Sequence, residues 1–215
     1  MTEPTRPAPL VTVRGEAQLE GPPDLATLSI TLHASGDTAA AVRTRLAAGS
    51  AQIAQLVQTF AEALEGSSTS GLHVAPVFGR RTPGRISGYA GTFSAQLVLH
   101  DFDALSPVVL AATKLPDSQV DGPWWSLRTD SPLHRQVRIA AIADARTRAA
   151  DYAAAFDATL AGLVEVSDLE SGFGGGGGMR AFAMAKGVED DRAIDFEPAQ
   201  QTVSGQVTVR FALRL

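Results

Sequence analysis

Strict alternation of apolar and polar residues at both ends of the chain limits its fold more than any other sequence feature. In residues 10–20, LVTVRGEAQLE, small or apolar residues occupy the odd positions from Val11 to Leu19, and polar residues lie between them. Residues 201–215, QTVSGQVTVRFALRL, alternate in the same way. Because successive side chains of a strand point to opposite faces, each stretch predicts a strand with one buried face.

Strand-like and helix-like stretches follow one another along the rest of the chain. Further strands are predicted at residues 25–36, 72–78, 88–101, 118–129 and 161–170. Between them, an apolar stripe at helical spacing from Val42 to Leu64 predicts a long helix, capped by Asp37 or Thr38. The Ser- and Gly-rich stretch 66–71 is expected to end this helix and to precede the next strand.

Two more helices are predicted in the second half of the chain. A short helix is predicted at residues 102–114, starting at Asp101 or Asp103. A long, alanine-rich helix follows Ser131-Pro132, which fits an N-cap followed by proline at the first helical position. Its predicted buried side comprises Leu133, Val137, Ala140, Ala141, Ala145, Ala149, Tyr152 and Phe156.

This order of elements predicts an α+β fold with a mainly antiparallel sheet and helices packed on one face. The turn sequence GPPD between the first two strands indicates a hairpin. Residues 1–9 are expected to be a disordered N-terminal lead, and residues 10–215 a single domain, because no linker divides them. The core is expected to include Leu56, Phe60, Phe93 and Phe211.

Charge and composition narrow the function classes. The net charge is -5, which disfavours nucleic acid as a partner, since its binding requires excess cation to displace counterions from phosphate. The chain has no cysteine, which excludes disulfides and thiolate chemistry. No apolar run is long enough for a membrane span, and the N-terminus has no signal-peptide pattern, so we expect a cytoplasmic location.

A run of five glycines, Gly174, Gly175, Gly176, Gly177 and Gly178, precedes Met179 and Arg180 and raises the question of a phosphate site. A P-loop requires Lys and then Ser or Thr after its last glycine, and a dinucleotide site requires a helix there. Neither pattern is present. The run is therefore interpreted as a flexible connection, with a partner-binding or pore-lining loop that includes Arg180 as the open alternative.

No catalytic or metal-binding pattern emerges. The four histidines, at positions 33, 73, 100 and 134, have no helical i, i+4 spacing, and the acidic stretch 187–198 lacks the spacing of a calcium loop. No G-x-S-x-G nucleophile motif is present, and Ser87 and Ser94 have no evident base. We expect no cofactor and no metal.

Two surface features indicate binding. Arg80, Arg81 and Arg85 form a basic turn, read either as a soluble turn or as a contact for an anionic partner or acidic neighbouring subunit. In the predicted strand at 118–129, Trp124 and Trp125 must point to opposite faces. One is expected in the core; the other is covered either by a loop of its own chain or by a subunit interface.

Four segments together resemble the SIMPL-domain family, a domain of unknown function that includes periplasmic immunogenic proteins of Gram-negative bacteria. They are VTVRGEAQLEGPPDLATLSITL (11–32), GYAGTFSAQLVLHDFDALSPVVLAAT (88–113), AIADARTRAADYAAAFDATLAGLVEV (141–166) and VSGQVTVRFAL (203–213). The resemblance implies an α+β fold and, in some members, ring-like or channel-like oligomers. It also implies links to envelope stress, to oxidative stress and, in animals, to signalling adaptors, and it supplies no catalytic residues.

The sequence therefore predicts a non-enzymatic protein that self-assembles, binds a protein partner, or does both, and the resemblance adds a stress response as its expected setting. A homo-oligomer is expected, and an unknown protein partner remains open. The alternative is a small-molecule binder or enzyme with a pocket between sheet and helices, which would require polar groups that converge inward.

Overall fold

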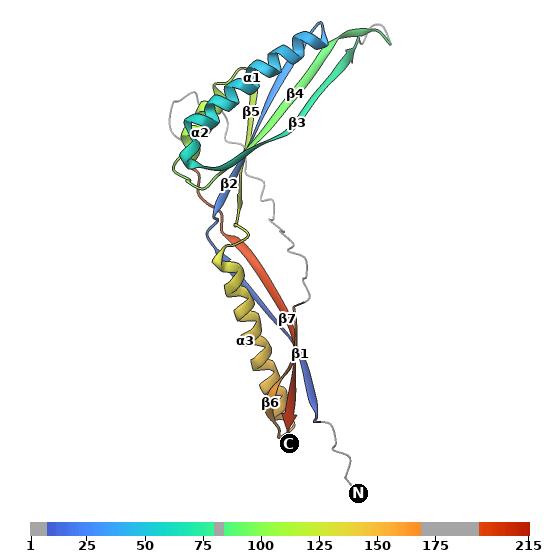
Figure 1. Cartoon of the computed structure of the whole chain (residues 1–215), viewed down its shortest axis with the longest axis vertical. Helices are drawn as coiled ribbons and strands as arrows, with labels where there is room; N and C mark the ends of the chain where they lie inside the picture. The colour runs from blue at the N-terminus through green and yellow to red at the C-terminus, as the bar shows by residue number, and fades with distance from the viewer. Residues whose placement is uncertain (1–7, 80–83, 169–193) are drawn as a thin grey trace. The chain divides into compact units, whose positions relative to one another are not determined.

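A computed structural model describes residues 8–79, 84–168 and 194–215 (Figure 1). The observed order of strands and helices is the order predicted from the sequence, with one added 3-10 turn, and the α+β class is confirmed. The elements are β1 (Leu10–Gly21), β2 (Leu25–Gly36), α1 (Ala39–Thr59), η1 (Ala61–Ala63), β3 (Leu64–Phe78), β4 (Ile86–Leu99), α2 (Leu105–Thr113), β5 (Ser118–Ser126), α3 (Pro132–Ala155), β6 (Thr159–Ser167) and β7 (Gln201–Arg214).

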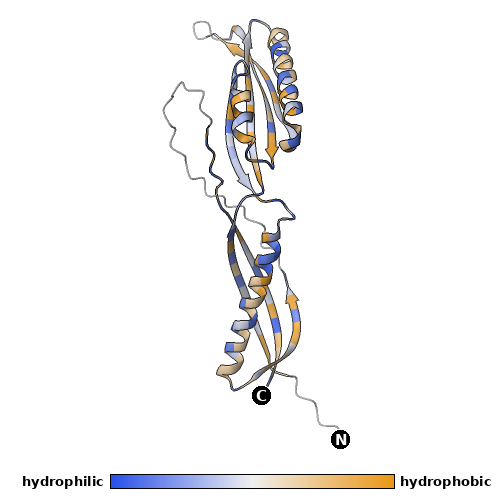
Figure 2. Ribbon diagram, turned by 90° about the vertical axis from the view of Figure 1, so that its left-hand side faces the viewer, coloured by the Kyte–Doolittle hydropathy of each residue, from blue (hydrophilic) through white to orange (hydrophobic). Residues whose placement is uncertain are grey.

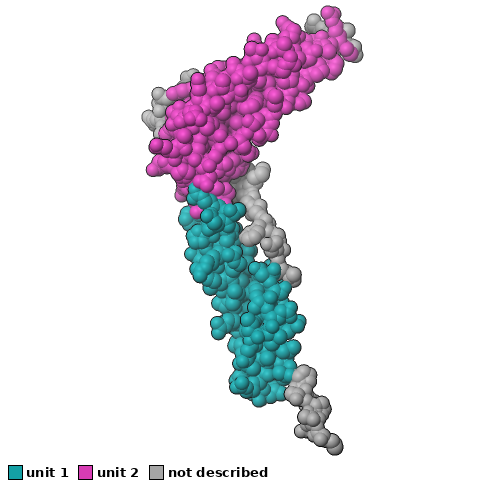
Figure 3. All heavy atoms as spheres, viewed as in Figure 1, with its two compact units in different colours: residues 1–22, 128–183, 200–215 teal, residues 23–127, 184–199 magenta. Residues whose placement is uncertain are grey.

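The chain divides into two compact units, each with its own antiparallel sheet (Figure 3). The first unit contains β1, α3, β6 and β7, with strand order β1-β7-β6. The second contains β2 to β5 with α1 and α2, and its strand order is β3-β4-β2-β5. Within each unit, helices pack against one face of the sheet, and both long helices carry a mixture of apolar and polar residues (Figures 1 and 2).

The second unit is held by the apolar stripe of α1. Thr38 caps this helix by accepting a hydrogen bond from the backbone N–H of Ala41, at 3.2 Å. The predicted stripe is buried over β2 and β4, where strict alternation places every second side chain under the helix. The buried residues of this contact are Val42, Leu46, Ile53 and Leu56 of α1, Ala26, Leu28, Ile30 and Leu32 of β2, and Ala95, Leu97 and Leu99 of β4.

The first unit depends on small residues that allow α3 to lie very close to β1. The buried side of α3 is a column of alanines at every fourth position, comprising Ala141, Ala145, Ala149 and Ala153. Gly15 of β1 faces this column, and a Cβ at Gly15 would lie 2.1 Å from the carbonyl oxygen of Ala141. No side chain fits at that position, so the glycine sets the distance between helix and strand.

The predicted hairpin of the first two strands is wrong. β1 pairs with β7 over its whole length, from Leu10↔Ala212 to Gly21↔Gln201, whereas β2 pairs with β4 and β5. The GPPD sequence connects two units rather than two neighbours in one sheet. Local turn chemistry carries no information about a partner strand that lies far away in the sequence.

Two smaller predictions are also corrected. The Ser- and Gly-rich stretch 66–71 belongs to the edge strand β3, where pairing with β4 outweighs its low strand propensity. Tyr152 and Phe156, predicted on the buried side of α3, are 56% and 71% exposed. The buried stripe drifts around the helix from Val137 to Ala153, because four residues turn a helix by slightly more than 360°.

The two compact units do not test the prediction of a single domain over residues 10–215, because a domain is defined by what folds independently. It stays a prediction. Residues 1–7 of the predicted N-terminal lead lie outside the described residues.

Replacing Gly15 with Ala is expected to lower the free energy of unfolding by about 2–3 kcal/mol, because the new Cβ collides with the α3 backbone. The matched control is Gly162→Ala in β6, where a Cβ meets nothing within 4 Å. This control is expected to stay within about 0.5 kcal/mol of the wild type. Urea denaturation followed by circular dichroism measures both. Equal stabilities of the two variants would contradict the close approach of α3 to β1.

Candidate functional site on the open face of the four-stranded sheet

The face of the four-stranded sheet that points away from α1, here called the open face, is mainly polar. Its residues alternate with the buried ones along each strand. They include Thr27, Ser29, Thr31 and His33 of β2, His73 of β3, Thr92, Ser94, Gln96 and the apolar Val98 of β4, and Gln119, Asp121 and Trp124 of β5.

The two tryptophans of β5 occupy opposite faces of this sheet. Trp125 pairs with the buried Ala26, packs against the core, and meets the ring of Phe102 edge-on, with the ring centroids 4.9 Å apart. Trp124 pairs with Thr27 on the open face and is 49% exposed. The described residues therefore leave half of a large aromatic side chain in water on a mainly polar surface.

A local irregularity of β5 fixes the position of this pair. The register between β2 and β5 shifts between Thr27 and Ser29, at the level of Gly122. Gly122 has φ +114°, and a Cβ there would lie 2.7 Å from the carbonyl oxygen of Thr27. Only glycine combines this backbone conformation with such a close approach. After this backbone conformation at Gly122, Trp125 points to the core and Trp124 to the open face.

The small polar side chains of the open face bond to one another. The hydroxyls of Thr31 and Ser94 lie 3.1 Å apart across β2 and β4. On β5, the amide nitrogen of Gln119 donates to both carboxylate oxygens of Asp121, each at 3.1 Å. These bonds satisfy polar groups of the open face within the sheet itself.

The structure brings together two histidines that the sequence did not connect. Thr92 of β4 pairs with His33 on one side and with His73 on the other, so the three residues form one row on the open face. They line part of a shallow hollow of about 380 Å³ that Asp117 also borders. Strand register places these three residues in one row. The spacing of positions 33 and 73 in the sequence does not predict that register.

Within residues 8–79, 84–168 and 194–215, no group of three or more His, Asp or Glu side chains is arranged to hold a metal ion. The hydroxyl of Ser87 donates to the carbonyl oxygen of Val77 at 3.0 Å, and that of Ser94 is bonded to Thr31. Neither serine has an imidazole or carboxylate as its partner in these contacts.

Of the predicted basic turn, Arg85 is exposed directly before β4. Arg80 and Arg81 lie outside the described residues, as do Gly174, Gly175, Gly176, Gly177, Gly178 and Arg180 of the predicted glycine loop. Their proposed role in contacting partners stays a prediction.

Truncating each tryptophan separates their roles. Trp125→Ala is expected to lower the free energy of unfolding by about 2–4 kcal/mol, because it removes the contacts with Phe102 and the core. Trp124→Ala is expected to cost less than about 1 kcal/mol, because half of this side chain is already exposed to water. Thermal and urea denaturation at one protein concentration provide the comparison. A larger loss for Trp124 would show that its own chain holds it in place.

No helix among the described residues combines the length and the apolar character needed to cross a membrane. None of the curated proteins compared with the chain matches it. A family model does match: SIMPL, a protein of unknown function (DUF541), aligns with residues 11–211. This match runs from the start of β1 into the last strand, β7, and so includes both sheets and the row of open-face residues. The chain belongs to the SIMPL family.

Proposed function

We propose that this SIMPL-domain protein is a non-enzymatic binding module that associates with copies of itself through the open face of its four-stranded sheet. The observation that carries the proposal is the position of Trp124. It is half exposed on a sheet face that is mainly polar.

An aromatic residue in such a setting has the chemistry of an interface centre. Tryptophan is enriched among the few residues that dominate binding energies, and a surrounding ring of polar groups excludes water without contributing much energy itself. On the open face, Thr27 lies directly beside Trp124, and Ser29 and Gln119 belong to the surrounding polar surface. The arrangement provides one anchor and a polar rim on one rigid sheet.

The chemistry of the open face favours a second copy as its occupant. Thr, Ser and Gln side chains donate and accept hydrogen bonds, so two identical faces related by a twofold axis can satisfy each other. Asp121 is the one carboxylate among the open-face residues named above, and its two oxygens already accept from Gln119. Little like-charge repulsion therefore opposes the association.

The alternative function, a small-molecule binder or enzyme with a pocket between sheet and helices, has less support. The described side chains between α1 and the sheet are apolar and buried, with Leu28, Ile30 and Leu97 fully shielded from water. A ligand site there would require polar groups directed inward. Saturable stabilisation of the protein by a metabolite in a thermal-shift screen would favour this alternative.

The test of the proposal is the solution mass of Trp124→Ser, measured by light scattering coupled to size exclusion. The wild type is expected to be larger than the 22.4 kDa of one chain, and Trp124→Ser is expected to weaken its association at least about 30-fold, as for a binding hot spot. Tyr152→Ser is the matched control, because Tyr152 is a similarly exposed aromatic residue on α3. An unchanged mass for Trp124→Ser, or an equal effect of Tyr152→Ser, would sink the proposal.

A further inference from the structure

We infer that the outer edge of β6 is a second self-association site, at which β6 pairs antiparallel with β6 of another copy. The inference rests on the proposed self-association and assigns it an additional, separate contact. Among the described residues, β6 pairs only with β7, so the backbone groups on its other side have no partner strand. Such an edge is a template for another chain.

The side chains of this edge are apolar and exposed. Leu163, Val164 and Val166 are 61%, 52% and 50% exposed, although they lie within one short strand. α3 packs mainly against β1 and β7 and much less against β6. Three neighbouring branched apolar residues in water on an edge strand favour association.

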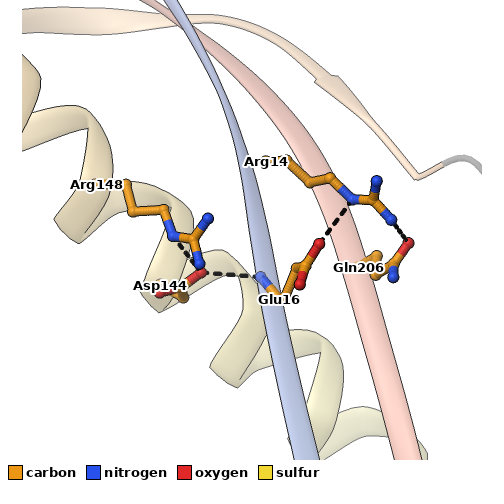
Figure 4. A network of polar contacts seen from close by, with 5 residues as sticks. All are labelled: Arg14, Glu16, Asp144, Arg148 and Gln206. Carbon is orange, nitrogen blue, oxygen red and sulfur yellow. Dashed lines mark hydrogen bonds and ion pairs between the residues drawn. The ribbon is translucent and has the colours of Figure 1, made fainter.

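The opposite edge of the same sheet, β1, is protected. Asp144 of α3 reaches over β1 and accepts a hydrogen bond from the backbone N–H of Glu16 at 2.9 Å (Figure 4). Arg148 holds this carboxylate through an ion pair of 3.0 Å. Arg14 lies beside Glu16 and pairs with it, and also bonds to Gln206 of β7. A side chain that caps an edge N–H blocks strand addition, and the described residues show no such cap on β6, although Glu165 of β6 forms an ion pair with Arg210.

An antiparallel register centred on Leu163 places apolar residues of β6 opposite apolar residues of β6 in another copy. On the helix-facing side of the sheet, every third residue of β6 pairs with every second residue of β7. The pairs are Leu160 with Leu213, Leu163 with Phe211, and Val166 with Val209. Bulges in β6 between these pairs account for its spacing of three residues. In the proposed register Leu163 lies opposite Leu163 of the other copy, and Leu160 lies opposite Val166. The same face of both strands then forms one continuous apolar ladder.

The register also keeps like charges apart. Glu165 would lie opposite Ala161, and the two Glu165 residues would be separated by four positions along the strands, about 13 Å, which exceeds the Debye length of about 8 Å. Within its own chain, Glu165 is neutralised by Arg210 at 2.9 Å. No buried or facing pair of equal charges results.

The contact is small. A single nine-residue edge provides less than the roughly 800 Å² per partner of a typical stable interface. We therefore expect association through β6 to depend on protein concentration and to break readily when a charge is introduced.

The chain has no cysteine, so a single introduced thiol reports on one position. Directly opposite residues of an antiparallel pair have Cα atoms about 4.5–5.5 Å apart, within disulfide range. Leu163→Cys is expected to form a covalent dimer at least about 10-fold faster than Gln18→Cys under the same mild oxidant. Gln18 is the matched control, because it is exposed on the protected edge β1.

Val164→Lys provides an independent measurement. Val164 is half exposed, so the fold is expected to tolerate the charge, which circular dichroism checks, while association through β6 weakens at least about 10-fold. The inference is overturned if Leu163→Cys cross-links no faster than Gln18→Cys, or if Val164→Lys leaves the concentration dependence of the mass unchanged. In that case self-association through Trp124 still stands if Trp124→Ser disrupts it. A wild-type monomer at every concentration overturns both.

Discussion

The covering of a sheet by helices on one face is the constraint from which the other features of this protein follow. In the four-stranded sheet, α1 buries alternate residues such as Leu28 and Leu97, and the residues between them face away from that helix. In the three-stranded sheet, α3 does the same through Ala141 and Ala145 against β1 and β7. The face of each sheet that its helix does not cover must be exposed to water or bound by a partner. The two sheets differ in the side chains that they present on this face.

The open face of the four-stranded sheet is mainly polar, with hydrogen bonds between its side chains, and Trp124 is its aromatic residue on β5. The open face of the three-stranded sheet is charged and paired, as Arg14 with Glu16 and Arg210 with Glu165 show. Exposed ion pairs of this kind contribute little stability, but they maintain solubility and disfavour wrong associations. The contrast directs the search for partners to Trp124 and to the edge of β6.

Family membership and fold leave the cellular role to experiment. The SIMPL family is one of unknown function, and its match extends over both units. What the structure contributes is a set of surfaces that can be tested separately. Trp124 and Val164 are exposed and lie on different units, so substitutions at one site do not disturb the packing around the other.

The sequence by itself determined the elements and their faces. Period-two alternation predicted β1 and β7, helical spacing predicted the buried stripe of α1, and adjacency predicted that Trp124 and Trp125 face opposite sides. These properties are local, because they depend only on the backbone geometry of one element.

Tertiary structure alone decided which strands pair. β1 lies beside β7 rather than β2. The Ser- and Gly-rich stretch 66–71 is a strand because it pairs with β4. His33 and His73 lie on either side of Thr92 in one row. Strand pairing is fixed by hydrogen bonds and packing between residues far apart in the sequence. No local pattern in the sequence predicts it. The capped edge of β1, and the edge of β6 that has no partner strand among the described residues, are therefore evident only in the folded chain.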